Sequence, residues 1–173
     1  NQRIFHDANI GRSSDFVKRF NLIFTGCACI ISNVLYTGIS MKISEIIRSR
    51  GRSLSFEFFP PANPAGEEKL FQRIANLEAF NPSFISVTQH AGRDTLLKTR
   101  QIVRKIHDHT GLTVMPHITC ADPRRSELKP AIEYYRDMGI ENILALRGDP
   151  EEYGPEIFDG ETHFRFAADL VRF

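Results

Sequence analysis

Apolar residues recur along residues 52–173 in two alternating patterns, short unbroken runs and longer stretches with helical spacing. The apolar runs lie at 53–59, 84–88, 112–118 and 142–146. Helical spacing follows each run, over 66–80, 94–110, 126–138 and 163–172. Pro60 and Pro61 end the first run because proline cannot donate a ladder hydrogen bond. Gly111 and Gly139 close two of the helices, and Ser126 is the expected N-cap of the third.

Strands that alternate with helices predict βαβ units and a parallel sheet buried on both faces. Two α/β folds fit, an open doubly wound sheet and a closed (β/α)8 barrel. A dinucleotide-binding doubly wound sheet needs a glycine-rich turn after its first strand, but that turn is formed here by residues 59–62, FPPA. The barrel is therefore favoured. Because a barrel needs eight units, we expect the first four units only, a truncated half-barrel.

Residues 1–40 do not share this alternation. The apolar stretch at 20–35 leaves three readings: a signal peptide, a membrane span, or sequence upstream of a natural start at Met41. We favour the third, because residues 41–50 open an amphipathic helix. The buried face of that helix is expected to hold Ile43, Ile46 and Ile47. The expected division is a leader of uncertain role over 1–40 and a barrel domain over 41–173.

Composition and charge exclude several classes of protein. The chain has 173 residues with 22 basic and 21 acidic side chains, a net charge of +1. Without a basic patch, neither nucleic acid nor stable association with an anionic membrane is expected. The cysteines are Cys27, Cys29 and Cys120, an odd number without metal-ligand spacing. Neither a disulfide scaffold nor a metal site is expected.

Polar or ionisable residues accompany each of the four predicted strands. They are Glu57, Thr88, His117, Thr119 and the turn Arg147-Gly148-Asp149. In a (β/α)8 barrel the carboxyl ends of the strands meet at one rim, where the chemistry takes place. The sequence therefore predicts a site built from residues that are far apart along the chain.

Glu57 is the most informative of these residues, because it stands between aromatic side chains in Phe56-Glu57-Phe58-Phe59. Apolar surroundings raise the pKa of a carboxyl group and suit it to general-acid work. The alternative is a strand glutamate facing solvent. His117 is open between a structural and a functional role. Arg147 could bind a phosphate or carboxylate in a bidentate manner.

Four ordered motifs resemble the methylenetetrahydrofolate reductase family. They are FEFFPP at 56–61, SVT at 86–88, PHITC at 116–120 and ALRGD at 145–149. The resemblance runs from about residue 41 to the end of the chain. It implies a (β/α)8 barrel that holds FAD and reduces 5,10-methylenetetrahydrofolate to 5-methyltetrahydrofolate with NADH or NADPH, in one-carbon and methionine metabolism.

The resemblance also implies roles for individual residues. Glu57 would be the general acid, and Asp149 would act beside the flavin and the pterin. The residues expected to contact the flavin are Thr88, Gln89, Ala91, His117, Arg147, Gly148, Asp149, Phe166 and Ala167. The loop after the second strand departs from the family pattern of an aromatic residue followed by glycine, since it reads QHAGRD at 89–94.

The resemblance implies a folate substrate and a cytoplasmic homo-oligomer. The chain alone is expected to be inactive, because the family's remaining folate and nicotinamide contacts follow its first four units. Two alternatives stay open. One is a non-catalytic flavin- or folate-binding half-barrel that dimerises through its open strand edges. The other is a related barrel enzyme fused to a methyltransferase.

Overall fold

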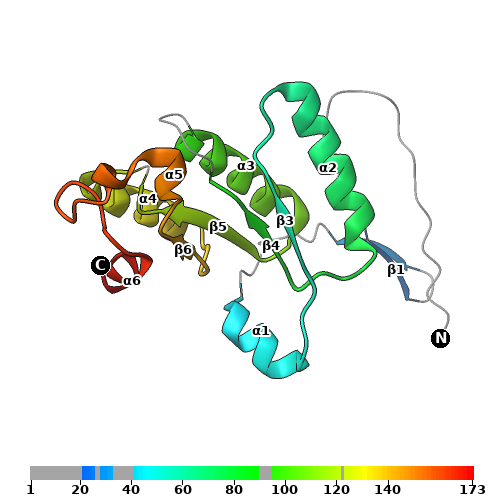
Figure 1. Ribbon diagram of the computed structural model, residues 1–173. Coiled ribbons are helices and arrows are strands. Elements are labelled where there is room, and N and C mark those ends of the chain that lie inside the picture. The colour runs from blue at the N-terminus through cyan, green and yellow to red at the C-terminus, as the bar shows by residue number, and fades with distance from the viewer. Residues whose placement is uncertain (1–20, 26–27, 33–40, 90–94, 122) are drawn as a thin grey trace. The chain divides into compact units, whose positions relative to one another are not determined.

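The computed structural model describes residues 21–25, 28–32, 41–89, 95–121 and 123–173 (Figure 1). The chain divides into two compact units, Asn1–Tyr36 and Thr37–Phe173. In the first unit, strand β1 (Asn21–Thr25) pairs antiparallel with β2 (Ala28–Ser32). The sequence predicted no fold for this segment, and the hairpin does not indicate a function for it.

The second unit begins with helix α1 (Ile43–Arg50), which ends at Gly51 with φ of 71°. Ile46 is 3% exposed but Ile47 is 47% exposed, so the expectation of one buried face shared by all three isoleucines is wrong for Ile47. The helix is anchored at its start by Asn142, whose Oδ1 accepts from Ile43 N at 2.8 Å and whose Nδ2 donates to Met41 O at 2.8 Å. These bonds tie α1 to the segment that leads into the last strand.

Four parallel strands form the sheet of this unit, in the order β3-β4-β5-β6. Their bounds are β3 (Ser55–Phe58), β4 (Phe84–Val87), β5 (Val114–Thr119) and β6 (Leu144–Leu146). Spatial order thus follows sequence order, and no crossover reverses direction. A doubly wound nucleotide-binding sheet does reverse, so the described sheet is consistent with part of a (β/α)8 barrel, as the sequence predicted.

Helices α2 (Pro64–Glu78), α3 (Thr95–Thr110) and α4 (Arg125–Asp137) connect the strands. The Asn63 side chain caps α2 by accepting from Gly66 N at 2.9 Å. The prediction of Ser126 as the N-cap of α4 is wrong: Arg124 holds that position, and the Glu127 carboxylate accepts from its backbone N at 2.8 Å. A glutamate reaching back from the third helical position is the acidic half of a capping box.

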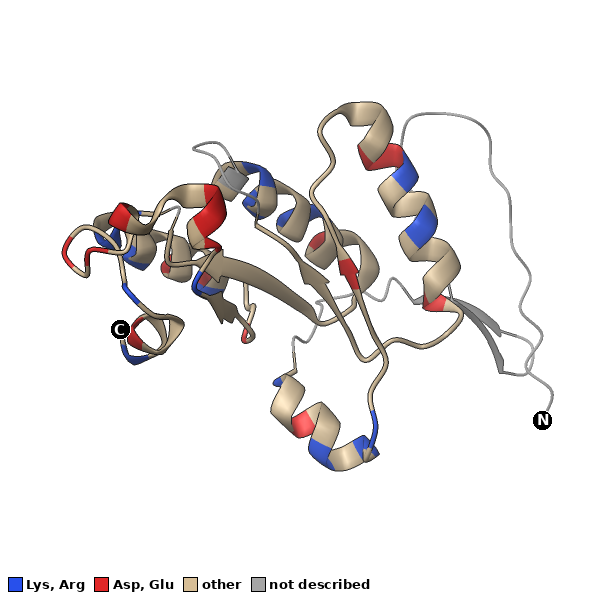
Figure 2. Ribbon diagram, in the orientation of Figure 1, with Lys and Arg blue, Asp and Glu red and all other residues tan. Residues whose placement is uncertain are grey.

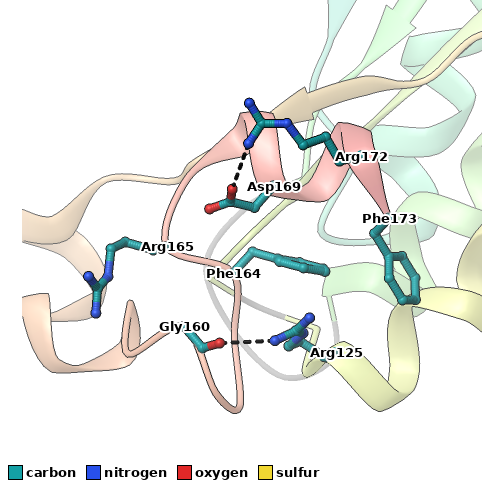
Figure 3. A pocket seen from close by; sticks show the side chains of 7 residues that line it. All are labelled: Arg125, Gly160, Phe164, Arg165, Asp169, Arg172 and Phe173. Carbon is teal, nitrogen blue, oxygen red and sulfur yellow. Dashed lines mark hydrogen bonds and ion pairs between the residues drawn. The ribbon is translucent and has the colours of Figure 1, made fainter.

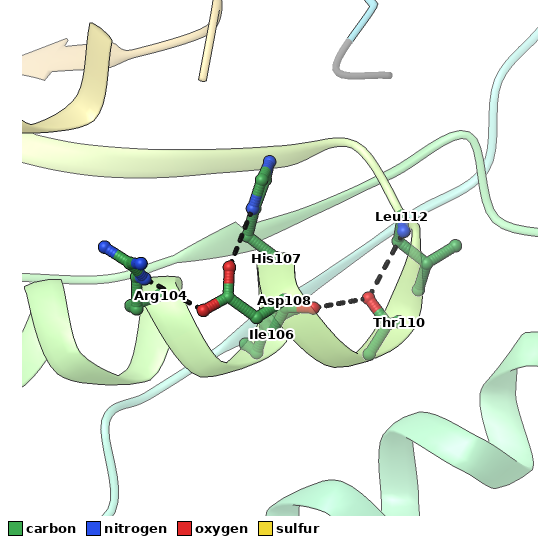
Figure 4. Close-up of polar contacts among 6 residues, drawn as sticks. All are labelled: Arg104, Ile106, His107, Asp108, Thr110 and Leu112. Carbon is green, nitrogen blue, oxygen red and sulfur yellow. Dashed lines mark hydrogen bonds and ion pairs between the residues drawn. The ribbon is translucent and has the colours of Figure 1, made fainter. Parts of the chain in front are cut away.

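The end of α3 is fixed by one threonine (Figure 4). Thr110 Oγ1 donates to Ile106 O at 2.8 Å and accepts from Leu112 N at 3.2 Å. Gly111 follows the helix with φ of 61°, a backbone conformation that glycine adopts without a Cβ penalty. The turn leads directly into β5.

The segment after β6 differs from the single helix predicted over 163–172. It forms helix α5 (Pro150–Tyr153), the 3-10 turn η1 (Pro155–Ile157) and the short helix α6 (Ala167–Arg172). Asp159 holds the intervening loop, because its Oδ1 accepts from Glu161 N at 2.7 Å and Thr162 N at 2.9 Å. Side-chain bonds to local backbone of this kind compete with helix formation, so the helix starts later than its apolar spacing predicted.

Helices α2, α3, α4 and α6 share one hydrophobic core with a face of the sheet. Fully buried strand residues there include Val87, Val114 and Ile118, and they share a core with Ile106 of α3 and Leu128 of α4. Among the described residues, none of the helices combines the length and apolar character needed to cross a membrane.

Candidate active site

The strand register assigns the polar strand residues to a single face. Glu57 pairs with Ser86, and Ser86 pairs with Met115. Since side chains alternate across a strand and paired positions share a side, Thr88 and His117 lie on that same face. The alternate positions, such as Val87, Val114 and Ile118, lie on the other face, against the helices. We call the surface formed by Glu57, Ser86, Thr88, His117 and Thr119 the polar face.

Glu57 is the one charged residue in the four strands β3 to β6; β4 and β5 are free of charge in Figure 2. Its Oε2 accepts a hydrogen bond from Ser86 Oγ at 3.5 Å and lies 3.5 Å from His117 Nε2. The expectation of apolar surroundings is wrong, because the Glu57 side chain is 53% exposed. Phe56 and Phe58 precede and follow it along the strand, and alternation directs them to the opposite face.

Two buried polar atoms on the polar face lack a hydrogen-bond partner among the described residues: Thr88 Oγ1 and His117 Nε2. His117 is 4% exposed, and burial lowers its pKa below the usual 6.5 although Glu57 acts in the opposite direction. The Thr88 backbone is fully engaged, since its N donates to Phe58 O at 2.9 Å and its O accepts from Thr99 Oγ1 at 3.1 Å. Buried polar groups are almost always hydrogen-bonded, so these two atoms suit a polar ligand.

Gln89 and Ala91 were both predicted to contact the cofactor from the loop after β4. Gln89 is buried, and its Oε1 accepts from Thr119 N at 3.3 Å, a bond that ties the end of β4 to the end of β5. Ala91 lies outside the described residues.

The end of β6 gathers the second group of predicted residues. The Arg147 guanidinium lies 4.7 Å from the ring centre of Phe158 and 5.7 Å from that of Phe166. Asp149 caps α5, because its Oδ1 accepts from Glu151 N at 2.9 Å. Such stacking holds an arginine side chain in place, while Arg147 itself remains exposed.

Gly148 is the glycine that this turn requires. Its φ is 87°, and a Cβ there would meet Ala121 Cβ at 3.0 Å. The backbone between Arg147 and Asp149 therefore adopts a conformation and a packing that disfavour other residues. Ala167, also predicted to contact the cofactor, is half-buried at the start of α6.

The predicted residues thus form two groups, one on the polar face and one at the end of β6. Sequence reasoning missed the contact of Ser86 with Glu57 and the stacking of Phe158 on Arg147. Strand register would have found the first, since pairing β3 with β4 in parallel sets position 86 beside 57. The stacking of Phe158 on Arg147 depends on the path of a loop, and no sequence pattern predicted that path.

A cavity of about 350 Å³ lies outside both groups (Figure 3). It is lined by Arg125, Gly160, Phe164, Arg165, Asp169, Arg172 and Phe173. Arg125 donates to Gly160 O at 2.9 Å and stacks 4.4 Å from the Phe164 ring centre, and Arg172 pairs with Asp169 at 3.3 Å. Its charges are already engaged within the protein. In the described part of the chain, no cluster of three His, Cys, Asp or Glu side chains could hold a metal ion.

A parallel sheet wound in one direction, with one face toward the helices and the polar strand residues on the other, is consistent with a βα-repeat protein of the barrel class. The family profile of methylenetetrahydrofolate reductase matches residues 42–173. The chain belongs to that family.

Named relatives agree with the family match. The 5,10-methylenetetrahydrofolate reductase of Buchnera aphidicola subsp. Schizaphis graminum is 47% identical over 117 residues, 68% of this chain and 38% of its own length. That of Pectobacterium carotovorum is 40% identical over 136 residues, 77% of this chain and 42% of its own. Methylenetetrahydrofolate reductase (NADH) 1 of Arabidopsis thaliana is 35% identical over 130 residues, 75% of this chain and 22% of its own. The relatives are oxidoreductases by name, and the chain spans well under half of their length.

Proposed function

We propose that this chain provides the general acid and the first flavin contacts of a reductase that converts 5,10-methylenetetrahydrofolate to 5-methyltetrahydrofolate. The observation that carries the proposal is the polar face, where Glu57, the one charged residue of the described sheet, lies 3.5 Å from the buried His117 Nε2 and shares a face with the buried, unpartnered Thr88 Oγ1. NADH or NADPH is the proposed reductant, and the name of the Arabidopsis relative specifies NADH for that protein.

The residues present fit FAD. Thr88 Oγ1 offers hydrogen-bonding capacity that the described residues leave unused. Gly148, with φ of 87°, lets backbone approach a ligand closely. We assign FAD contacts to Thr88, Gln89, Ala91, His117, Arg147, Gly148, Asp149, Phe166 and Ala167. When bound, the flavin would supply a ring system that accepts a hydride from the nicotinamide and passes it to the folate.

Glu57 is assigned the role of general acid toward the folate. Its O–H bond breaks as an N–H bond forms on a nitrogen of the imidazolidine ring. The C–N bond of that ring then opens with its electron pair on the protonated nitrogen, which leaves an iminium at the other nitrogen. The iminium carbon takes the hydride.

Asp149 is assigned an electrostatic role beside the flavin and pterin rings. Its carboxylate is fixed by capping α5 through Glu151 N, so its charge stays at a defined place. A fixed charge near the ring system tunes the electronics of a cofactor without taking part in bond making.

The family resemblance further supports closure of a full (β/α)8 barrel in the whole protein, a cytoplasmic location and a homo-oligomer. The edges of the described sheet are β3 and β6, each of which pairs with a strand on one side only. In a closed barrel both edges are paired. Size-exclusion chromatography with light scattering would test the oligomer.

The test uses a chimera in which residues 42–173 replace the matching segment of the Pectobacterium reductase. The expected result is FAD-dependent oxidation of NADH or NADPH coupled to methylenetetrahydrofolate. Glu57→Gln in the chimera should lower folate reduction at least 100-fold, as expected for general-acid catalysis, and retain the flavin. Glu68→Gln, an exposed carboxyl on α2, is the matched control and should retain full activity.

Three results would contradict the proposal. Glu57→Gln could leave folate reduction unchanged, which would exclude Glu57 as the acid. The chimera could bind flavin and folate without any turnover, which would favour a binding module. The third result combines two measurements. The absorption spectrum of the chain after incubation with FAD would show no retained flavin band, and Thr88→Val and His117→Gln would leave the flavin affinity of the chimera unchanged. Together these outcomes would remove both residues from the flavin site.

A further inference from the structure

The motif SVT at 86–88 contains a residue without an assigned role, Ser86. It lies in the middle of β4, directly beside Glu57 in the register of the parallel pair. Ser86 is buried, and its Oγ donates to Glu57 Oε2 at 3.5 Å. A carboxylate only accepts, so the hydroxyl is the donor in this contact.

The same carboxylate oxygen faces a second potential donor. His117 Nε2 lies 3.5 Å from Glu57 Oε2 and has no aligned hydrogen bond to any described residue. Burial lowers the pKa of this histidine and so favours its neutral form. A neutral imidazole with its proton on Nε2 donates at that atom, and hydrogen bonds of catalytic groups often tighten only when substrate is bound.

Two potential donors therefore converge on Oε2, and no described residue donates to Oε1. In a protonated carboxyl group, the oxygen that accepts hydrogen bonds is the carbonyl oxygen, and the other oxygen carries the proton. Donors on Oε2 thus place the acidic proton on Oε1. With the proton on Oε2 instead, Ser86 Oγ would have to accept and the His117 Nε2–H would face an O–H rather than an acceptor.

We propose that Ser86 is a positioning residue that fixes the Glu57 carboxyl group through Oε2, with His117 on the same oxygen, so that Oε1 delivers the proton to the folate. This inference rests on the proposed function of Glu57 as general acid. Ser86 itself touches neither substrate nor cofactor in this assignment. Its contribution is to the rate of the step that uses the proton.

The first test needs no activity. In the chain itself, with selectively labelled glutamate, the ¹³Cδ resonance of Glu57 should shift in Ser86→Ala and return toward the wild-type position in Ser86→Thr, which restores the hydroxyl. Ser83→Ala is the matched control, because Ser83 is also buried and adjoins the same strand. An unchanged Glu57 resonance in Ser86→Ala would overturn the inference.

The second test separates the two half-reactions in the chimera. Ser86→Ala should slow folate reduction about 5- to 20-fold in kcat, with little change in the KM for folate and none in the reduction of the flavin by nicotinamide. Ser86→Thr should recover most of that loss. Equal slowing of both half-reactions, or no recovery with threonine, would make Ser86 merely structural.

The two proposals fail in different ways. If Glu57→Gln remains active, the proposed function of Glu57 is wrong whatever Ser86 does. If Glu57→Gln is inactive while Ser86→Ala reduces folate at the wild-type rate, Glu57 keeps its role and only the positioning by Ser86 is refuted.

Discussion

The two faces of the β3–β6 sheet are built from the same strands but differ in chemistry. One face is apolar and packs under helices, with the fully buried Val87, Val114 and Ile118 at its centre. The polar face carries Glu57 of β3 and His117 of β5. Because strand side chains alternate with a period of two, a single strand such as β5 contributes to both faces at once.

The contrast separates stability from function. Removal of buried apolar surface weakens the fold, whereas polar groups that lack partners within the protein add little stability and are available for a ligand. Substitutions on the apolar face should therefore lower the free energy of unfolding. Substitutions on the polar face should instead act on binding and catalysis.

The largest expected effect on stability is that of Ile118→Ala. Ile118 is fully buried on the apolar face of β5, and truncation of a buried isoleucine costs about 2–5 kcal/mol through lost burial and the cavity left behind. Urea unfolding followed by circular dichroism measures it. Ser86→Ala, one strand away on the polar face, should cost roughly 1 kcal/mol or less. Similar losses for the two variants would remove the distinction between the faces.

A second prediction concerns the turn after β6, where backbone conformation rather than a strand face sets the geometry. Gly148→Ala should cost about 1–3 kcal/mol for the strained φ, with a further loss because the new Cβ meets Ala121. Gly139→Ala is the control, because its φ is 79° but a Cβ there meets nothing within 4 Å. Thermal unfolding should rank Gly148→Ala as the less stable variant, and flavin affinity of the chimera should fall only with Gly148→Ala. Equal behaviour of the two would mean that close packing at Gly148 has no role.

The third prediction is a pH dependence that originates on the polar face. Burial lowers the pKa of His117 below its unfolded value of 6.5, so the unfolded chain binds the proton more tightly. Stability should therefore fall as the pH drops below 6.5 and level off below the folded pKa, by about 1.4 kcal/mol for each unit between the two values. His117→Gln should flatten this part of the stability profile between pH 7 and 5. A slope that persists in the variant would assign it to another group.

Much of the fold could be predicted because its strands and helices have strong periodicity. The four strands and the crossover helices α2, α3 and α4 lie close to their predicted positions. The helix after β6 started later than predicted, because Asp159 holds a loop by bonding to local backbone. Apolar spacing reports burial, but it does not register such competition from side-chain hydrogen bonds.

The candidate site was predicted as a set of residues but not as an arrangement. Motifs identified Glu57 and His117, yet the apolar neighbours of Glu57 in sequence lie across the strand from it, so its side chain is half exposed instead of buried. The stacking of Phe158 on Arg147 joins a strand end to a later loop. Sequence neighbours describe local context, whereas a site depends on register and on tertiary contacts.

The smallest expected effect belongs to an ion pair on the helices, away from both faces. Lys105 Nζ lies 2.6 Å from Glu67 Oε1, with side chains 43% and 30% exposed. Despite the short distance, water screens such a pair, and its coupling energy should be roughly 0.2–1 kcal/mol, decreasing further in high salt. A double-mutant cycle of Glu67→Gln and Lys105→Met, measured by urea unfolding at low and high ionic strength, gives this value. A coupling as large as the loss in Ile118→Ala would mean that charge pairs between α2 and α3, and not only the apolar face, hold the helices on the sheet.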